Sequence, residues 1–476
     1  MRHRILAALL GCVLGRAQDV RSYRIAHQEE ILNSFVQFLS IPNVASDKPN
    51  IGKNADFIMT ALAQRGVSAR LLQVPDAPPV VYAEINPPGA KGTVTFYAHY
   101  DGQPVEPAKW ATPPFQPTRR GDRLYGRSTS DDKAPIEALL VSLDAMKASG
   151  VQPSANVRFF FEGEEEAGSA HLAQIVEKYR DLLKTDLWLF CDGPVDQSRK
   201  QQMYFGARGD TNLDIKVFGP IHELHSGHYG NWAPNPALML ARLLASMKDD
   251  EGHVSVEDFY DGIEPMTASE KAAIAAAPVN DDALKHEFGF ARTEGNGEKL
   301  IELIAQPALT VRGLSSASVG ATARNVIPAT AEATIDLRLV KGIDFKRQQD
   351  RVIAHIKKQG YHVTEEEPDM DTRQTYAKIA QIKRGAGYNA ARTSLDLPVS
   401  KLVIATLQRA RGPLVVMPTL GGSIPLYLFT DVLKTPAIGI PIANHDNNQH
   451  SSDENIRLQN LWDGIETLSA LVTIKM

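Results

Sequence analysis

The sequence contains very little cysteine and no strong excess of either charge. Only 2 of its 476 residues are cysteines, Cys12 and Cys191, which excludes a disulfide framework and a cysteine-based zinc cluster. Any metal ion must therefore be bound by histidine and carboxylate side chains. The formal net charge of −5 gives no basic surface for nucleic acid or an anionic membrane, so partners of those kinds are disfavoured.

Long hydrophobic runs are also missing. The apolar run Ile5–Leu14 follows Arg2, His3 and Arg4, and about ten apolar residues are too few to cross a bilayer as a stable helix. We therefore expect no stable membrane span. The pattern resembles a secretory signal, which predicts a signal peptide at residues 1–17 and a periplasmic or secreted protein, with a cytoplasmic protein as the alternative. The stretch around Cys12 loosely resembles a lipoprotein processing site.

Hydrophobic patterning divides the chain into parts, and a length of 476 residues predicts two or three domains. Strand and helix patterns alternate up to residue 208, which predicts an α/β fold: a mixed, mostly parallel sheet flanked by helices. The predicted strands span residues 68–74, 80–85, 93–98, 157–161 and 187–190, and the predicted helices include residues 135–149 and 170–179.

The pattern changes after Gly209. Strands with alternating polar and apolar residues are predicted at 211–218 and 331–339, and helices at 236–248 and 346–360, which indicates a smaller α+β domain with one open sheet face. The first pattern returns near Ala391, with helices predicted at 398–411 and 456–474. We therefore predict a catalytic domain built from residues 18–208 and 391–476, interrupted by an inserted domain at 209–390. Between 249 and 318 only one helix, 269–277, is predicted.

Polar side chains follow three of the predicted strands. His99, the acids Glu164 to Glu166, and Asp192 each follow a predicted strand, and such strand ends share one edge of a parallel sheet. Nitrogen and carboxylate ligands suit zinc, manganese or cobalt, and two neighbouring cations need a carboxylate between them, for which Asp131 is a candidate. Each stretch alone also fits a solvated acidic turn or a chance His-x-Asp pair, and spacing alone does not decide which acids act.

Seven motifs occur in a fixed order along the chain: HYD, YGRSTSDDK, EGEEEAGS, HSGHYG, NVIP, GGSIP and QHSSDEN. As an ordered set they resemble the M20 metallopeptidases. The resemblance implies a fold of the zinc-exopeptidase type with an inserted lid and dimerisation domain. It also implies two divalent metal ions, zinc first and manganese or cobalt as alternatives. One ion would be bound by His99, Asp131 and Asp192, and the other by Asp131, Glu166 and His450.

The same resemblance assigns further roles. Glu165 would be the general base, Asp101 would orient the His99 ring, and a cis peptide bond would follow Asp131. Two lid residues would reach the active site of the partner subunit, which implies a homodimer: His225 and Asn325. The terminal carboxylate of the substrate would be bound by Arg338, Ser423 and the backbone of Gly422.

The chain departs from the family pattern at two positions, because Ser128 and Ala134 stand where the family usually has glycine. Neither change removes a predicted ligand. The implied function is a dinuclear metal-dependent exopeptidase acting on dipeptides or short peptides with a free C-terminal carboxylate. The alternatives are an N-acyl-amino-acid amidohydrolase with the same site and, more remotely, a non-catalytic binding protein on this fold.

Overall fold

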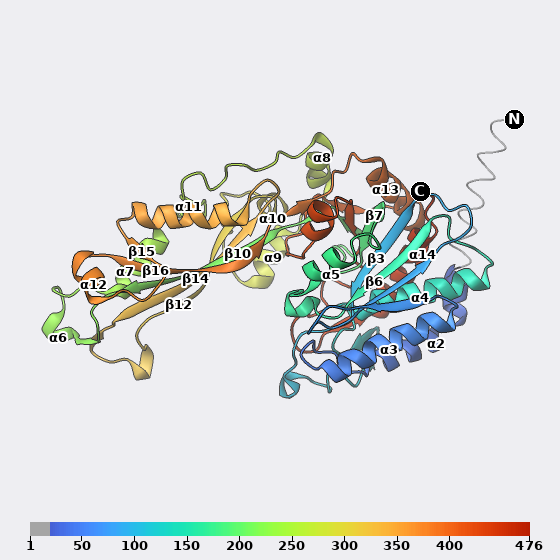
Figure 1. Ribbon diagram of the computed structural model, residues 1–476, viewed down its shortest axis with the longest axis horizontal. Coiled ribbons are helices and arrows are strands. Elements are labelled where there is room, and N and C mark those ends of the chain that lie inside the picture. The colour runs from blue at the N-terminus through green and yellow to red at the C-terminus, as the bar shows by residue number, and fades with distance from the viewer. Residues whose placement is uncertain (1–19) are drawn as a thin grey trace.

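The computed structural model describes residues 20–476, and they form two lobes of unequal size joined side by side (Figure 1). The predicted signal peptide at residues 1–17 lies outside the described residues. Among the described helices, none is long and apolar enough to cross a membrane.

The larger lobe contains an eight-stranded sheet in the order β1-β2-β6-β3-β7-β19-β8-β18. Its middle strands β6, β3, β7 and β19 are parallel, whereas β1 with β2, β2 with β6, and β19 with β8 are antiparallel, which confirms a mixed, mostly parallel sheet. The strands are β1 (Ala69–Leu72), β2 (Val80–Ile85), β3 (Thr93–His99), β6 (Asn156–Glu162), β7 (Leu187–Phe190), β8 (Gln202–Tyr204), β18 (Val415–Met417) and β19 (Ala437–Gly439).

Both faces of this sheet are buried, which explains why its strands are apolar at nearly every position. Alternate residues point to opposite faces, so Phe159 and Phe161 pack with one hydrophobic cluster and Phe160 with another. The first cluster contains side chains of α2 (Gln28–Leu39), α3 (Lys48–Gln64), α4 (Lys133–Ala148), α13 (Pro398–Arg411) and α14 (Leu458–Val472). The second contains side chains of α5 (Leu172–Lys178) and of η4 (Leu428–Val432).

The smaller lobe contains a five-stranded sheet in the order β12-β14-β10-β16-β15. Its strands are β10 (Gly209–Phe218), β12 (Ala308–Ser315), β14 (Thr330–Leu339), β15 (His362–Thr364) and β16 (Ile379–Tyr388). Helices α7 (Pro236–Ala245) and α11 (Phe345–Lys358) pack on one face, where Ile215 and Ile335 are buried. The opposite face exposes polar side chains such as Asp214 and Glu332, so one face is open as predicted. The domain boundaries at 209 and 390 stay a prediction.

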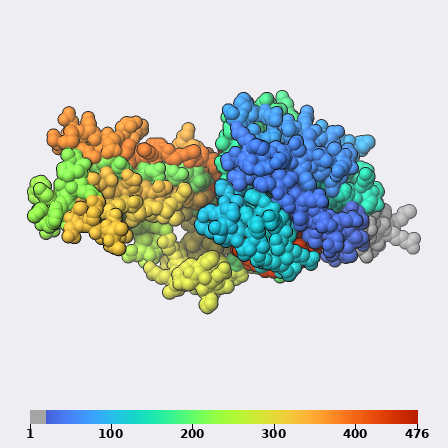
Figure 2. Space-filling view, turned by 90° about the horizontal axis from the view of Figure 1, so that it is seen from below, coloured from blue at the N-terminus to red at the C-terminus, as the bar shows by residue number. Residues whose placement is uncertain are grey.

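The segment 249–318 has more structure than its sequence pattern indicates. It contains α8 (Ala268–Ala276), α9 (Asp281–Phe288), α10 (Leu300–Ile304) and β12, of which only α8 was predicted. The yellow segment with α9 and α10 lies where the two lobes meet (Figures 1 and 2). Strand β12 has no alternating pattern because it is an edge strand in which only Leu309 is buried.

Short elements complete the architecture. Near the C-terminus β20 (Asn455–Arg457) pairs with β5 (Arg123–Tyr125), which pairs with β4 (Thr118–Arg120). The final helix therefore begins at Leu458 and not at residue 456. At the far end of the smaller lobe lie β11 (Leu224–His225), α6 (Ser226–Tyr229), β13 (Val326–Ile327) and α12 (Met370–Thr375). Between the lobes, β9 (Gly206–Ala207) pairs with β17 (Ala391–Arg392).

Candidate active site

The predicted metal ligands of the larger lobe lie at one edge of its sheet. His99 ends β3, the acids Glu164 to Glu166 follow β6, and Asp192 follows β7. These three strands are parallel neighbours, so their carboxyl ends meet at the same edge. The topology thus brings together side chains that are far apart in the sequence.

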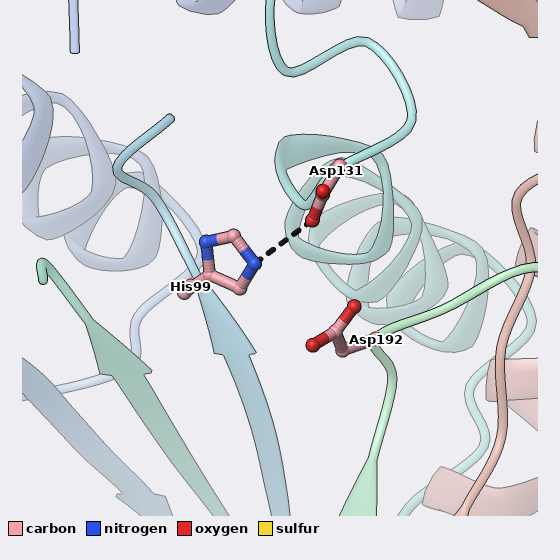
Figure 3. Close-up of side chains that lie close together, drawn as sticks. All are labelled: His99, Asp131 and Asp192. Carbon is pink, nitrogen blue, oxygen red and sulfur yellow. Dashed lines mark hydrogen bonds and ion pairs between the residues drawn. The ribbon is translucent and has the colours of Figure 1, made fainter. Parts of the chain in front are cut away.

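Two groups of possible metal-binding side chains share one carboxylate. The first group is His99, Asp131 and Asp192, and the second is Asp131, Glu166 and His450; the possible ligand atoms in each group lie within 4.8 Å of one another. His99 Nε2 is 3.0 Å from Asp131 Oδ1 (Figure 3). His450 Nε2 is 3.2 Å from Asp131 Oδ2 and 3.1 Å from Glu166 Oε2. Asp131 therefore turns one oxygen toward each group.

The chemistry of these side chains fits two divalent cations. Each group offers imidazole nitrogen and carboxylate oxygen, the ligands typical of zinc and similar metals. Burial raises the pKa of Asp192 to about 7, and the negative charge of Asp131 acts in the same direction. Burial also raises the pKa of Glu165 well above its ordinary value, with Asp192 and Glu166 adding to the effect. A bound cation would stabilise the ionised form of carboxylates that lie this close together at a buried sheet edge.

Glu165 and Asp101 lie beside the first group. Glu165 Oε2 is 4.0 Å from His99 Nε2, and Asp101 Oδ1 is 3.3 Å from His99 Nδ1. The two oxygens of Asp101 also accept hydrogen bonds from the backbone N–H groups of Glu165 and Glu166, each at 3.0 Å. Asp101 therefore orients both the imidazole ring and the segment that carries two of the acids.

The acidic segment differs locally from an extended strand. An extended segment would point Glu165 and Glu166 to opposite sides, but the residues Glu165–Ala167 form a 3-10 turn. Glu162 accepts a hydrogen bond from the Tyr97 hydroxyl at 2.6 Å, and Glu164 accepts one from the backbone N–H of His171 at 2.7 Å. These two acids lie in neither group. The Asp131–Asp132 peptide bond is cis, as the resemblance implies.

Two residues next to the site were not among the site residues predicted from the sequence. Gln103 Nε2 donates a hydrogen bond to Glu166 Oε2 at 2.8 Å, and Glu454 is buried beneath the loop that carries Asp131. Gln103 follows the HYD motif and Glu454 lies inside QHSSDEN. Their position beside the ligand motifs is the one signal that could have identified them.

The predicted carboxylate-binding residues meet where the two lobes join. Arg338 is on β14 of the smaller lobe, and its Nη1 donates to Ser423 Oγ of the larger lobe at 2.7 Å. Arg338 Nε donates to Asp336 Oδ2 at 2.9 Å, and the Gly422 carbonyl accepts the backbone N–H of Arg208 at 3.2 Å. Arg338, Gly422 and Ser423 are thus neighbours, as expected.

His225 and Asn325 are not brought to the metal groups within one chain. The Asn325 carbonyl accepts the backbone N–H of Ser226 at 2.9 Å, so these residues are close to each other. His225 immediately precedes α6, which lies at the tip of the smaller lobe, far from β3 and β6 (Figure 1). Both side chains are exposed. Within one chain they contribute nothing to the site.

The fold and the paired histidine–carboxylate groups define a metal-dependent hydrolase. A family model described as "Peptidase family M20/M25/M40" matches residues 95–474, so the chain belongs to that family. It is 25% identical to the human Beta-Ala-His dipeptidase over 95% of this chain and 91% of that protein. It is 28% identical to the Cys-Gly metallodipeptidase DUG1 of Candida albicans over 92% of this chain and 94% of that protein.

A solved structure has the same architecture. The M20 family metallo-carboxypeptidase Sso-CP2 from Sulfolobus solfataricus superimposes with a TM-score of 0.81 at 27% identity, covering 94% of this chain and 99% of that one. The resemblance inferred from the motifs is therefore confirmed. The protein is a metallopeptidase, which excludes the non-catalytic binding protein.

The predicted periplasmic or secreted location is wrong. The Cys-Gly metallodipeptidases of three yeasts match between 92% and 94% of the chain, and this relationship favours the cytoplasmic alternative. A few cationic residues before a short apolar run are a weak pattern, whereas the match to these relatives extends over nearly the whole chain.

Proposed function

We propose that this metallopeptidase is a dinuclear dipeptidase that hydrolyses the amide bond of dipeptides or short peptides with a free C-terminal carboxylate. The observation that carries the proposal is the sharing of Asp131 by two groups of metal-binding side chains, with Glu165 beside them. The dipeptidase names of two relatives support the substrate class.

In this proposal one metal ion is bound by His99, Asp131 and Asp192, and the other by Asp131, Glu166 and His450. Zinc suits these ligands best, with manganese and cobalt as alternatives. When bound, the pair of cations supplies a nucleophile from water near neutral pH and polarises the amide carbonyl.

Glu165 moves the proton. Its carboxylate accepts a proton from the attacking water and later returns it to the nitrogen of the leaving amine. The hydrogen bonds from the Glu165 and Glu166 backbone to Asp101 fix the turn that carries the carboxylate, and Asp101 also contacts the His99 ring. The base and one metal ligand are therefore positioned by the same side chain.

Arg338 binds the terminal carboxylate of the substrate. A guanidinium offers a planar pair of donors that matches a carboxylate, and contacts with Asp336 and Ser423 hold it in place. Ser423 and the backbone of Gly422 complete this part of the pocket. A substrate without the carboxylate should bind more weakly, because it leaves the half-buried Arg338 guanidinium with one hydrogen-bond partner fewer.

The active enzyme is a homodimer in this proposal. His225 and Asn325 are exposed at the tip of the smaller lobe, and they act by entering the site of the partner subunit, where His225 stabilises the oxyanion that forms on the carbonyl. In the same stretch of chain as His225, Trp232 is 79% exposed and Ile221 is 60% exposed. Large exposed apolar side chains at one place are typical of an interaction surface.

A substrate panel with defined metals tests the proposal. Protein freed of metal by a chelator should be inactive, and zinc, manganese or cobalt should restore hydrolysis of β-Ala-His and Cys-Gly but not of their C-terminal amides. Metal-independent hydrolysis would contradict the mechanism. Turnover of N-acetyl or N-succinyl amino acids without turnover of any dipeptide would favour the amidohydrolase alternative.

A further inference from the structure

We propose that Glu454 is a positioning residue whose buried carboxylate sets the place of Asp131, and with it the affinity of both metal groups. The inference rests on the proposed dinuclear site. It concerns a side chain that belongs to neither metal group, and whose effect passes through the loop 127–131.

The contacts of Glu454 all point to this loop. Its Oε1 accepts hydrogen bonds from the backbone N–H of Ser130 at 2.9 Å, the Ser130 hydroxyl at 2.8 Å and the backbone N–H of Asp131 at 3.0 Å. Its Oε2 accepts the backbone N–H of Ser128 at 2.9 Å and Nη1 of Arg127 at 2.8 Å. One carboxylate thus accepts five hydrogen bonds from four residues of this loop, and Ser130 donates two of them.

The surroundings make this arrangement sensitive to charge. Glu454 is fully buried, and the Arg127 guanidinium that pairs with it is 2% exposed and lies 5.1 Å from the centre of the Trp110 ring. A buried charge is tolerated only when its partners are complete, and removal of one partner is costly. The loop therefore has one low-energy arrangement around this carboxylate.

Glu454 also connects the two distant ligands. The backbone N–H of Gly126 donates to the Glu454 carbonyl at 2.9 Å, where β20 begins to pair with β5. His450 precedes Glu454 by one short turn of chain, and Asp131 donates its own backbone N–H to the Glu454 side chain. The residue therefore fixes the separation of Asp131 and His450, which belong to the same group.

Replacement by glutamine should disturb both metal groups at once. The amide NH2 of glutamine would face either Arg127 and Ser128 or Ser130 and Asp131, so donors would meet donors on one side. Because Asp131 turns one oxygen toward each group, a shift of its backbone changes both sets of distances.

The test compares Glu454→Gln with Glu466→Gln. Glu466 on α14 is a matched control because its carboxylate is also mostly buried and accepts hydrogen bonds from three arginines outside the metal groups, Arg21, Arg24 and Arg411. Both variants should lose thermal stability. Competition titration of metal-free protein with a chromophoric zinc chelator should show zinc affinity weakened about 10- to 100-fold at both sites in Glu454→Gln alone.

Unchanged zinc affinity in Glu454→Gln, or an equal loss in Glu466→Gln, would overturn the inference. If Glu454→Gln does not fold, Ser130→Ala decides the question, because it removes one of the five hydrogen bonds and should weaken zinc binding about 2- to 10-fold. Unchanged affinity in that variant would also overturn it. A wild-type protein that binds two zinc ions without hydrolysing dipeptides would contradict the proposed function alone.

Discussion

The two lobes contribute to the candidate site in different ways. The larger lobe brings His99, Asp131 and Asp192 together within one chain, and all three are buried. The smaller lobe leaves His225 and Asn325 exposed at its far end. Metal binding is therefore built into the core of one lobe, whereas the lid's share of catalysis depends on a second subunit in our proposal.

The sheets explain this difference. The eight-stranded sheet is covered by helices on both faces, so the residues at its carboxyl edge are shielded from water and fixed by packing. The five-stranded sheet has one open face, and its edge strand β12 is mostly exposed. Arg338 links the smaller lobe to the larger one through its hydrogen bond to Ser423, and Lys341 does so through its contact with Asp431.

The largest effect is expected in the larger lobe. Glu165→Gln should lower kcat on a dipeptide by about 10²- to 10⁴-fold, because the side chain can no longer accept a proton. Mass spectrometry should show that both metal ions are retained. The control Glu166→Gln should instead lose metal at the second group. Full activity in Glu165→Gln would show that Glu165 is not the general base.

The next prediction tests the proposed role of the smaller lobe. His225→Ala should lower kcat by about 10²- to 10³-fold through loss of one oxyanion donor. The matched control is His228→Ala, whose ring centre lies 4.5 Å from that of His225 and which should retain activity. Mixing inactive His225→Ala with inactive Glu165→Gln subunits should restore partial activity. The absence of rescue under subunit exchange would show that the lid does not act across a dimer.

A smaller effect is expected where the lobes meet. Arg338→Lys should raise KM for dipeptides about 10- to 100-fold with little change in kcat, because a lysine cannot bind a carboxylate through two parallel donors. Arg312→Lys, an exposed neighbour on β12, is the control and should leave KM unchanged. An unchanged KM in Arg338→Lys would place the carboxylate site elsewhere.

The last comparison uses the pH dependence of stability. Burial raises the pKa of Glu137 in the larger lobe to about 7. Glu137 binds a proton more tightly in the folded protein than in the unfolded chain. Its stabilising contribution to the free energy of unfolding is therefore complete below pH 4.5 and is lost as the pH rises to about 7. At pH 8 Glu137→Gln should therefore stabilise the protein by up to about 3 kcal/mol in urea unfolding, but not at pH 4.

The stability of the smaller lobe should respond to pH in the opposite direction. Burial lowers the pKa of His355, so the unfolded chain binds the proton more readily and stability falls as the pH drops below 6.5. His355→Gln should reduce this loss at acidic pH and leave the Glu137 effect unchanged. Equal responses of both variants at both pH values would show that the two lobes do not differ in this respect.

The sequence predicted the central strands well because they are apolar on both faces. The bounds of β2 and β7 agree with the prediction, whereas β8, β19 and β16 were missed. Strands β8 and β19 have only three residues each, and β16 carries two glycines and two cations among its ten. Segments so short or so polar give no period on which a prediction can rest.

The site was predictable as far as its residues follow strands. His99, Glu164 to Glu166 and Asp192 follow predicted strands, and Asp131 was a candidate for the shared carboxylate. The assignment of His450 and the separate roles of Glu165 and Glu166 depended on resemblance to the family. Glu454 lies inside the QHSSDEN motif, but its inferred role could not be read from the sequence because the residues it bonds are more than three hundred positions away. The 3-10 turn at Glu165 was missed for a related reason, since Asp101 supplies the hydrogen bonds that support it.

The position of β19 and β20 in the chain has a consequence for biosynthesis. Strand β19 is inserted between β7 and β8, and β20 ties Glu454 to the Asp131 loop, yet both leave the ribosome after the whole of the smaller lobe. The smaller lobe can fold while the sheet that precedes it in sequence still has a gap at β19. In the proposed mechanism, the nascent protein therefore cannot complete the group of Asp131, Glu166 and His450 before β20 has left the ribosome.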